Sequence, residues 1–181
     1  MMENQKTKDR TILLNEFSYY LVDFFMSVII GLGIVILLNI PLKFIRVINM
    51  DLCAFIVHLL SMGIVLYMRS YRRGYHTNTK TYTFDSKKAI LFVGIVFAIQ
   101  IVLIFVIGGH AVYITGPTYW FTTYLFPTID LTAAEGREMV AGYNWLFVLI
   151  ADVFIYAPIM VVSEYWGDKQ NKKELSETEG I

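Results

Sequence analysis

Cysteine is nearly absent from this sequence, and its scarcity excludes several kinds of site. The single cysteine, Cys53, cannot form an intrachain disulfide, a Cys-x-x-Cys redox pair or a cysteine-based zinc site. The three histidines, His58, His76 and His110, fall in different layers of the expected topology, so they cannot share one metal ion. We therefore predict that the chain holds no metal and no cofactor.

Catalytic motifs are missing as well. The chain has no G-x-x-x-x-G-K-[ST] loop for nucleotide phosphates, no H-E-x-x-H zinc motif, no G-x-S-x-G elbow and no protein-kinase motifs. Ser61 follows His58 by three residues, but we expect this pair in the middle of a membrane, without donors for an oxyanion. No catalytic set can be named, and we predict that the protein is not an enzyme.

Charge is scarce, and the apolar residues that replace it lie in long runs. Charged residues make up 17% of the chain and hydrophobic residues 56%, whereas about 25% of an ordinary soluble domain is charged. The net charge is zero, which gives no basis for binding nucleic acid. Four apolar runs reach the roughly 20 residues that cross a bilayer, and they must be helical because lipid cannot satisfy backbone polar groups. We predict an all-α integral membrane protein with four transmembrane helices, at about 17–40, 48–68, 89–108 and 144–166.

The distribution of basic residues predicts the orientation of these spans. Of the 15 lysines and arginines, all but three lie in the N-terminal tail (1–16), the C-terminal tail (167–181) and the connection between the second and third spans. The three on the other side are Lys43, Arg46 and Arg137. Because cytoplasmic segments of membrane proteins are enriched in lysine and arginine, we predict that both termini are cytoplasmic. The C-terminal tail is polar and has no apolar period, so we expect it to be flexible or to form a helix that frays. The short tails favour a bacterial plasma membrane.

Each predicted span carries a strongly polar residue within its apolar run. These residues are Asp23, His58, Gln100 and Asp152. An aspartate near the middle of a transmembrane helix costs about 2.5–3.5 kcal/mol on an insertion scale, and such a residue is a candidate functional site. The helical rise places Asp152 at a depth where His58 or Gln100 can meet it, and Tyr156 lies one turn away on the same face. Pro158 predicts a bend in this helix.

Two interpretations of these polar residues remain open. In the first, they form hydrogen bonds between helices and fix the packing, with Asp23 bonded to Ser27 or to a tyrosine hydroxyl. In the second, Asp152 and His58 form a pair that binds a proton or a cation at a solvent-filled cleft. Ser27 and Gly31 also form a small-xxx-small pair, which predicts that another helix packs closely against the first span.

The two long connections differ in character. The second-to-third connection is either a solvated loop that is basic because it is cytoplasmic, or a site whose basic residues bind anionic lipid headgroups or an acidic partner, at about 1 kcal/mol each towards anionic lipid. These residues are Arg69, Arg72, Arg73, Lys80, Lys87 and Lys88. The outer connection (110–143) is aromatic, with Tyr119 and Trp120 among its rings, and we expect it to lie along the outer interface or to form a lid or docking surface. Thr132 and Glu135 form a capping box that predicts a helix running into the fourth span.

These features favour a non-enzymatic, multi-pass membrane protein that serves as an accessory subunit. It would bind membrane lipid and either another membrane protein or a second copy of itself. The alternative is a small proton-coupled transporter or channel that uses Asp152 and His58. A solvent-accessible cleft at Asp152 would favour transport, whereas a dry, hydrogen-bonded aspartate would favour a structural role.

Overall fold

The computed structural model describes residues 2–42, 50–76, 84–108, 112–126 and 134–179, and every regular element in these ranges is helical. The elements are α1 (Met2–Leu42), α2 (Met50–His76), α3 (Ser86–Ile107), α4 (Val112–Thr115), α5 (Thr118–Leu125), α6 (Ala134–Ala151), the π-helix η1 (Asp152–Tyr156) and α7 (Ala157–Glu179). Within the described ranges, four helical stretches are long and apolar enough to cross a membrane: Ile12–Leu38, Met50–Tyr75, Ser86–Ile107 and Gly142–Thr178. The prediction of an all-helical chain with four such helices is therefore confirmed.

The last helix is longer than the apolar run that predicts it. α6, η1 and α7 follow one another without a break, and α7 continues to Glu179 through the segment predicted to be a flexible tail or a helix that frays. Side chains four residues apart support this polar end of the helix. Lys172 Nζ lies 2.6 Å from Asp168 Oδ2, and Gln170 Nε2 donates to Glu174 Oε1 at 2.9 Å.

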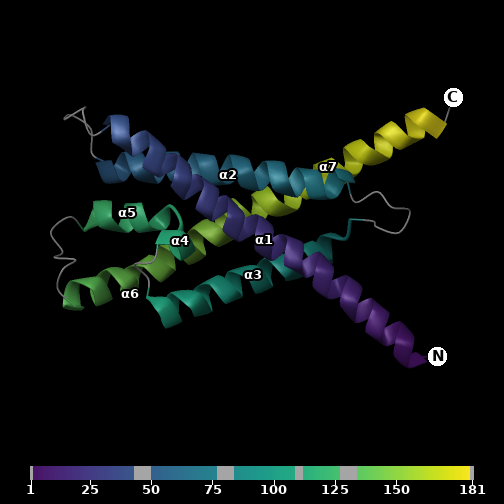
Figure 1. Ribbon diagram of the computed structural model, residues 1–181, viewed down its shortest axis with the longest axis horizontal. Helices are drawn as coiled ribbons and strands as arrows, with labels where there is room; N and C mark the ends of the chain where they lie inside the picture. Colours follow the sequence, from purple (N-terminus) through teal and green to yellow (C-terminus); the bar gives the residue numbers. More distant parts are fainter. Residues whose placement is uncertain (1, 43–49, 77–83, 109–111, 127–133, 180–181) are drawn as a thin grey trace.

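Helices α2 and α7 lie side by side, and glycines allow their backbones to touch (Figure 1). A Cβ atom built at Gly74 on α2 would overlap the carbonyl oxygen of Glu164 on α7. A Cβ atom built at Gly167 on α7 would likewise overlap the carbonyl oxygen of Tyr71 on α2. The obstruction in both cases is backbone, which cannot rotate away, so this crossing requires glycine on both helices. Figure 1 also shows that the two termini lie at the same end of the bundle.

Helix α1 also packs closely against α2, at the small residues in its middle. A Cβ atom at Gly31 would lie 2.7 Å from Cδ2 of His58, a contact too short for real carbon atoms. Ser27 is fully buried, and its hydroxyl donates to the carbonyl oxygen of Asp23 at 2.6 Å. The α1 face that carries Ser27 and Gly31 is thus used inside the chain.

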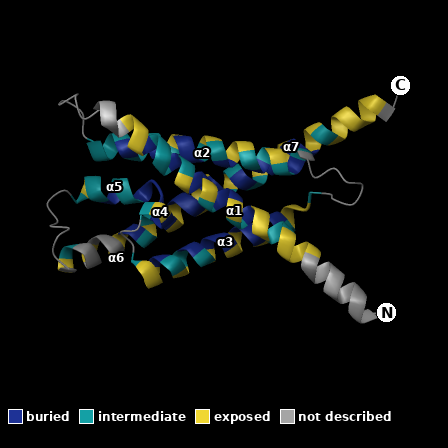
Figure 2. Cartoon of the chain, viewed as in Figure 1, coloured by how far each residue is buried: buried dark blue, intermediate teal, exposed yellow. Residues whose placement is uncertain are grey.

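The core lies where the faces of α1, α2, α3 and α7 meet, and the outward faces are apolar and exposed (Figure 2). Aromatic rings in edge contact fill part of the core: the Phe24 ring lies 5.5 Å from Phe97 and 6.3 Å from Tyr156, between centroids. Phe105 and Phe154, at 69% and 74% exposed, are among the large side chains on the outward faces. A sheath of exposed apolar side chains is typical of a protein whose surroundings are lipid.

Helices α4 and α5 form a short hairpin that enters the bundle from the outer connection. Gly116 takes the positive φ of 62° at the turn, a conformation that favours glycine. The tip is buried, and Gln100 Nε2 on α3 donates to the carbonyl oxygen of Ile114 at 2.7 Å. A segment lying flat along the interface would not make this contact, so the hairpin differs from the expected interfacial belt. The capping box predicted at Thr132 and Glu135 falls partly outside the described residues, which resume at Ala134 within α6, so the predicted start of this helix stays a prediction.

Candidate functional site

A buried network of charged side chains joins three helices near the end of the bundle that carries the termini. Arg73 on α2 donates to both carboxylates of the network, to Asp23 Oδ2 on α1 through Nη1 and to Glu164 Oε2 on α7 through Nη2 at 2.9 Å. Arg69 Nε also donates to Asp23, at 2.7 Å to Oδ1, and the Tyr20 hydroxyl donates to Glu164 Oε2 at 2.7 Å. The Arg73 guanidinium carbon lies 3.7 Å from the centroid of the Tyr20 ring. We call these five residues the ion network.

The ion network changes the interpretation of several sequence-predicted residues. Asp23 was expected to bond Ser27 or a tyrosine, but its carboxylate pairs with Arg69 and Arg73. These two arginines were expected to face lipid or a partner in a loop. Because α2 continues to His76, they remain on a helix, and both reach inward to Asp23. Two guanidinium groups balance two carboxylates, so the network has no net charge to attract an external ion.

Glu164 is the member of this network that the sequence reasoning missed. It is 0% exposed and lies close to the predicted inner end of the fourth span, where charged residues are common and do not by themselves indicate a site. A signal was present, however: arginine on a neighbouring span at a similar depth needs a carboxylate if it is buried. Gly74 and Gly167 were also missed, because Gly74 was assigned to a connection and Gly167 to the C-terminal tail rather than to a helix crossing.

The remaining predicted basic residues are dispersed. Lys88 Nζ lies 3.1 Å from Glu16 Oε2 on α1, whereas the side chains of Arg72 and Lys87 are exposed. Lys80 lies outside the described residues. The structure therefore does not gather the predicted basic set into one surface.

His58 is fully buried on α2 and uses both of its ring nitrogens. Its Nδ1 accepts from Trp120 Nε1 on α5 at 3.3 Å, and its Nε2 lies 3.1 Å from the carbonyl oxygen of Val28 on α1. Since an indole N–H only donates and a carbonyl only accepts, these partners assign the proton to Nε2 of a neutral ring. His58 thus links α1, α2 and the inserted hairpin. Trp120, predicted to lie at the interface, instead reaches into the bundle.

Tyr119, the neighbour of Trp120 on α5, is only partly buried. Burial raises the pKa of its hydroxyl, and the nearby carboxylate of Asp51 raises it further. The phenol therefore stays neutral over the physiological range and adds no charge to the surface around α5.

Asp152 is a buried carboxyl group that forms no side-chain hydrogen bond within the described part of the chain. It is 0% exposed, and neither carboxyl oxygen has a hydrogen-bond partner among the described residues. The Tyr156 hydroxyl and Gln100 Oε1 are likewise buried without a partner there. The predicted contact of Asp152 with His58 or Gln100 is not made, because His58 bonds Val28 and Trp120 and the Gln100 amide bonds Ile114.

A π-helical turn brings Asp152 to this position. Pro158 has no N–H to donate, so the α-helical bond to the carbonyl of Phe154 cannot form. The chain widens over Asp152–Tyr156, and Ala157 N–H bonds back to the carbonyl oxygen of Asp152. The disturbance that was predicted as a bend is thus a π-turn, in which residues four apart no longer align as in an α-helix. Turns of this kind occur frequently at functional sites.

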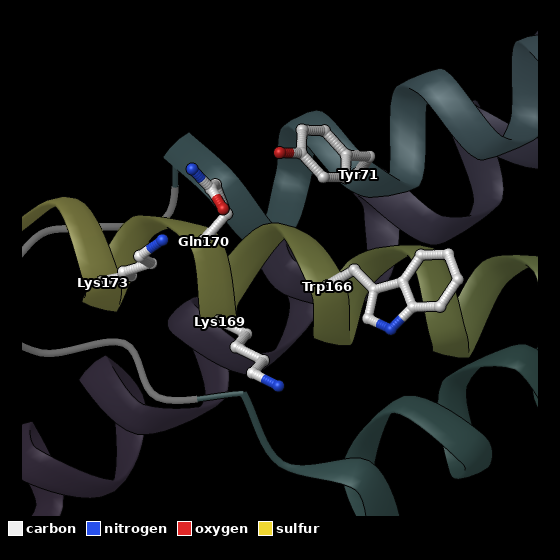
Figure 3. Close-up of a pocket in the computed structure, with 5 residues that line it drawn as sticks. All are labelled: Tyr71, Trp166, Lys169, Gln170 and Lys173. Atoms are coloured by element: carbon white, nitrogen blue, oxygen red, sulfur yellow. The ribbon is translucent and has the colours of Figure 1, made fainter.

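A pocket of about 340 Å³ opens where α2 and α7 run side by side (Figure 3). Its lining combines aromatic and cationic side chains: Tyr71, Trp166, Lys169, Gln170 and Lys173. All but Tyr71 belong to α7. Sequence reasoning placed Lys169 and Lys173 in a flexible tail and did not associate them with a site.

Comparisons with known proteins add no family. No protein-family model, no curated protein and no solved structure matches the chain. Among the described residues, no group of three or more His, Cys, Asp or Glu side chains is placed to hold a metal ion. Function must therefore be argued from the ion network, the buried Asp152 and the α2–α7 pocket.

Proposed function

We propose that this multi-pass membrane protein is a small proton-coupled transporter or channel in which Asp152 takes up and releases the proton. The observation that carries the proposal is Asp152 itself, which is fully buried within a membrane-spanning helix and has no partner for either carboxyl oxygen among the described residues. A buried polar group without a hydrogen bond is expensive, and natural proteins rarely keep one without a role. A carboxyl group in this position can bind and release a proton when the surrounding helices part.

The neighbours of Asp152 support a site rather than a packing defect. Tyr156 and Gln100 add two further polar atoms that find no partner in the described ranges, and the π-turn is a segment where helical hydrogen bonding is already disturbed. His58 has no free ring nitrogen in this conformation, so it is not the partner of Asp152 here. Its role in the proposal is to hold the inserted hairpin against α1 and α2 through Trp120.

The proposal can be tested with purified protein in liposomes that enclose a pH-sensitive dye. An imposed pH gradient, with valinomycin and potassium to balance charge, should drive proton flux through the wild type. Asp152→Asn removes the titratable group but keeps the shape, and it should abolish the flux while the protein still inserts and elutes as a single species. Asp168→Asn is the matched control and should retain the flux, because Asp168 pairs with Lys172 beyond the apolar part of the fourth span. Undiminished flux in Asp152→Asn would refute the proposal.

A second candidate is the non-enzymatic accessory subunit that binds lipid. Three features suggested a partner-binding role: the Ser27 and Gly31 face, the basic connection and the aromatic outer segment. The Ser27 and Gly31 face packs against α2 within the chain. In the basic connection, Arg69 and Arg73 form ion pairs with Asp23. In the aromatic segment, Trp120 donates a hydrogen bond to His58. The α2–α7 pocket is the specific observation that still favours lipid binding.

We also propose that the end carrying both termini faces the cytoplasm, in a bacterial plasma membrane. The support is the excess of lysine and arginine in the tails and the second-to-third connection. A single cysteine introduced by Glu177→Cys in a cysteine-free background should resist a membrane-impermeant thiol reagent added to intact cells. Labelling that is as fast in intact as in permeabilised cells would contradict this orientation.

A further inference from the structure

The α2–α7 pocket is built by one face of α7 and an aromatic side chain of α2. Trp166, Lys169, Gln170 and Lys173 recur at the three- and four-residue spacing that places side chains on one side of a helix. Tyr71 faces them from α2, beside the crossing where Gly167 touches the α2 backbone (Figure 3). Because the glycine contact fixes the two helices at close range, this lining is held in place by the fold rather than by a loop.

The order of side chains along α7 matches the order of chemical groups in a phospholipid. Val162 is apolar and 44% exposed, as expected where acyl chains lie, and Trp166 is 52% exposed one turn later. Tryptophan and tyrosine are enriched at the level of the headgroups. Lys169 and Lys173 follow at about 4–5 Å and about 10 Å beyond Trp166 along the helix axis, from the rise of about 1.5 Å per residue. The cations therefore stand above the aromatic level, where a lipid phosphate lies.

Two acidic residues, Glu174 and Glu177, lie close to the pocket and offset part of its positive charge. Glu174 accepts from the Tyr75 hydroxyl at 2.5 Å and from Gln170 Nε2 at 2.9 Å. Lys173 Nζ lies 3.9 Å from Glu177 Oε1, a loose and exposed pair that contributes little. Lys169 makes no salt bridge within the described part of the chain, so its charge is available to a ligand.

We propose that this pocket binds the headgroup of an anionic phospholipid. Lys169 and Lys173 bind the phosphate and the headgroup oxygens, while Trp166 and Tyr71 pack against the glycerol and the first part of the acyl chains. This inference deepens the lipid-binding candidate function and does not depend on proton handling at Asp152. An exposed apolar surface next to the lysines is what distinguishes a lipid from a soluble anion as the occupant.

Lipid retention measures this site directly. Protein incorporated into nanodiscs of phosphatidylcholine and phosphatidylglycerol should release with bound phosphatidylglycerol, counted by native mass spectrometry. The double variant Lys169→Gln/Lys173→Gln should lower the affinity about 30-fold, taking about 1 kcal/mol for each lysine and about 1.4 kcal/mol for each tenfold change. Lys169→Arg/Lys173→Arg is the control pair, because it keeps both positive charges at the same positions, and it should retain the lipid.

Further measurements distinguish a bound phospholipid from a soluble anion in the pocket. Trp166→Ala should also lower lipid retention, because the apolar part of the site is lost. Inorganic phosphate added to protein in pure phosphatidylcholine should not protect Lys169 from acetylation, whereas phosphatidylglycerol should. Equal lipid loss in the control pair, or full protection by phosphate alone, would overturn the proposal. Asp152→Asn should retain the lipid, so failure of the proton proposal and failure of this one give different results.

Discussion

Neutralising Arg73 provides the sharpest test of the ion network. Arg73→Gln removes a side chain that contacts both carboxylates, and of the partners of Glu164 named above it leaves the Tyr20 hydroxyl. Asp23 would keep Arg69. Glu164 is 0% exposed, so its carboxylate cannot turn to water without separating α2 from α7. The variant therefore leaves a buried negative charge without its counter-charge.

The expected loss of stability follows from that uncompensated charge. Removing one partner of a buried ion pair costs about 3–5 kcal/mol, whereas removing both can be neutral. The double variant Arg73→Gln/Glu164→Gln should therefore be more stable than the single variant, since the amide at position 164 can still accept from Tyr20. For a chain of this size, about 3–5 kcal/mol corresponds to a fall in Tm of about 6–20 °C. The double variant should recover at least half of that fall.

Thermal unfolding in detergent micelles, followed by near-UV circular dichroism, provides the measurement. Arg72→Gln is the control, because Arg72 is an exposed neighbour on α2, and its free energy of unfolding should change by less than about 0.5 kcal/mol. The reasoning is refuted if Arg73→Gln unfolds within 1–2 °C of the wild type, or about the error of such a scan. It is also refuted if adding Glu164→Gln lowers the Tm further, since the coupling between the two charges would then have the wrong sign.

Two further predictions concern contacts between helices. Gly74→Ala should prevent close packing of α2 and α7, because the added carbon meets backbone, and should sharply lower the yield of folded protein in size-exclusion chromatography. Gly33→Ala is the control and should elute as the wild type, because nothing lies within 4 Å of the added carbon. Equal behaviour of the two variants would contradict the close crossing of α2 and α7. Trp120→Phe removes the donor to His58 Nδ1 and should destabilise the protein by about 1 kcal/mol. The ¹⁵N chemical shift of the His58 ring, measured by NMR, should also change. An unchanged chemical shift would show that the hydrogen bond from Trp120 to His58 is absent.

The spans followed from the sequence, but their helical limits did not. A run of about 20 apolar residues has one stable form in lipid, which is why the four helices could be predicted. Hydropathy does not predict whether polar sequence beyond the membrane is helical. α7 continues to Glu179 because side-chain pairs such as Asp168 with Lys172 support it, and no hydropathy pattern reports such pairs.

For the polar residues within the spans, burial could be predicted from the sequence but hydrogen-bond partners could not. Asp23, His58, Gln100 and Asp152 stand out in the sequence because polar groups are rare in apolar runs, and all four are buried. Their partners could not be read from depth alone, because rotation of each helix and the inserted hairpin decide which groups meet. Gln100 and His58 both bond the hairpin or α1 instead of Asp152.

By itself, the sequence determined that this chain has four helices able to span a membrane. It also determined which residues of these helices cost free energy to place in lipid. Both results follow from the free energy of transferring single groups into lipid. The tertiary structure decided which of those groups are satisfied. It placed Arg73 between Asp23 and Glu164, and it left Asp152 without a partner in the described part of the chain. Such outcomes depend on contacts between residues far apart in sequence. They are fixed only when helices meet at positions such as Gly74, where the absence of a side chain lets two backbones touch.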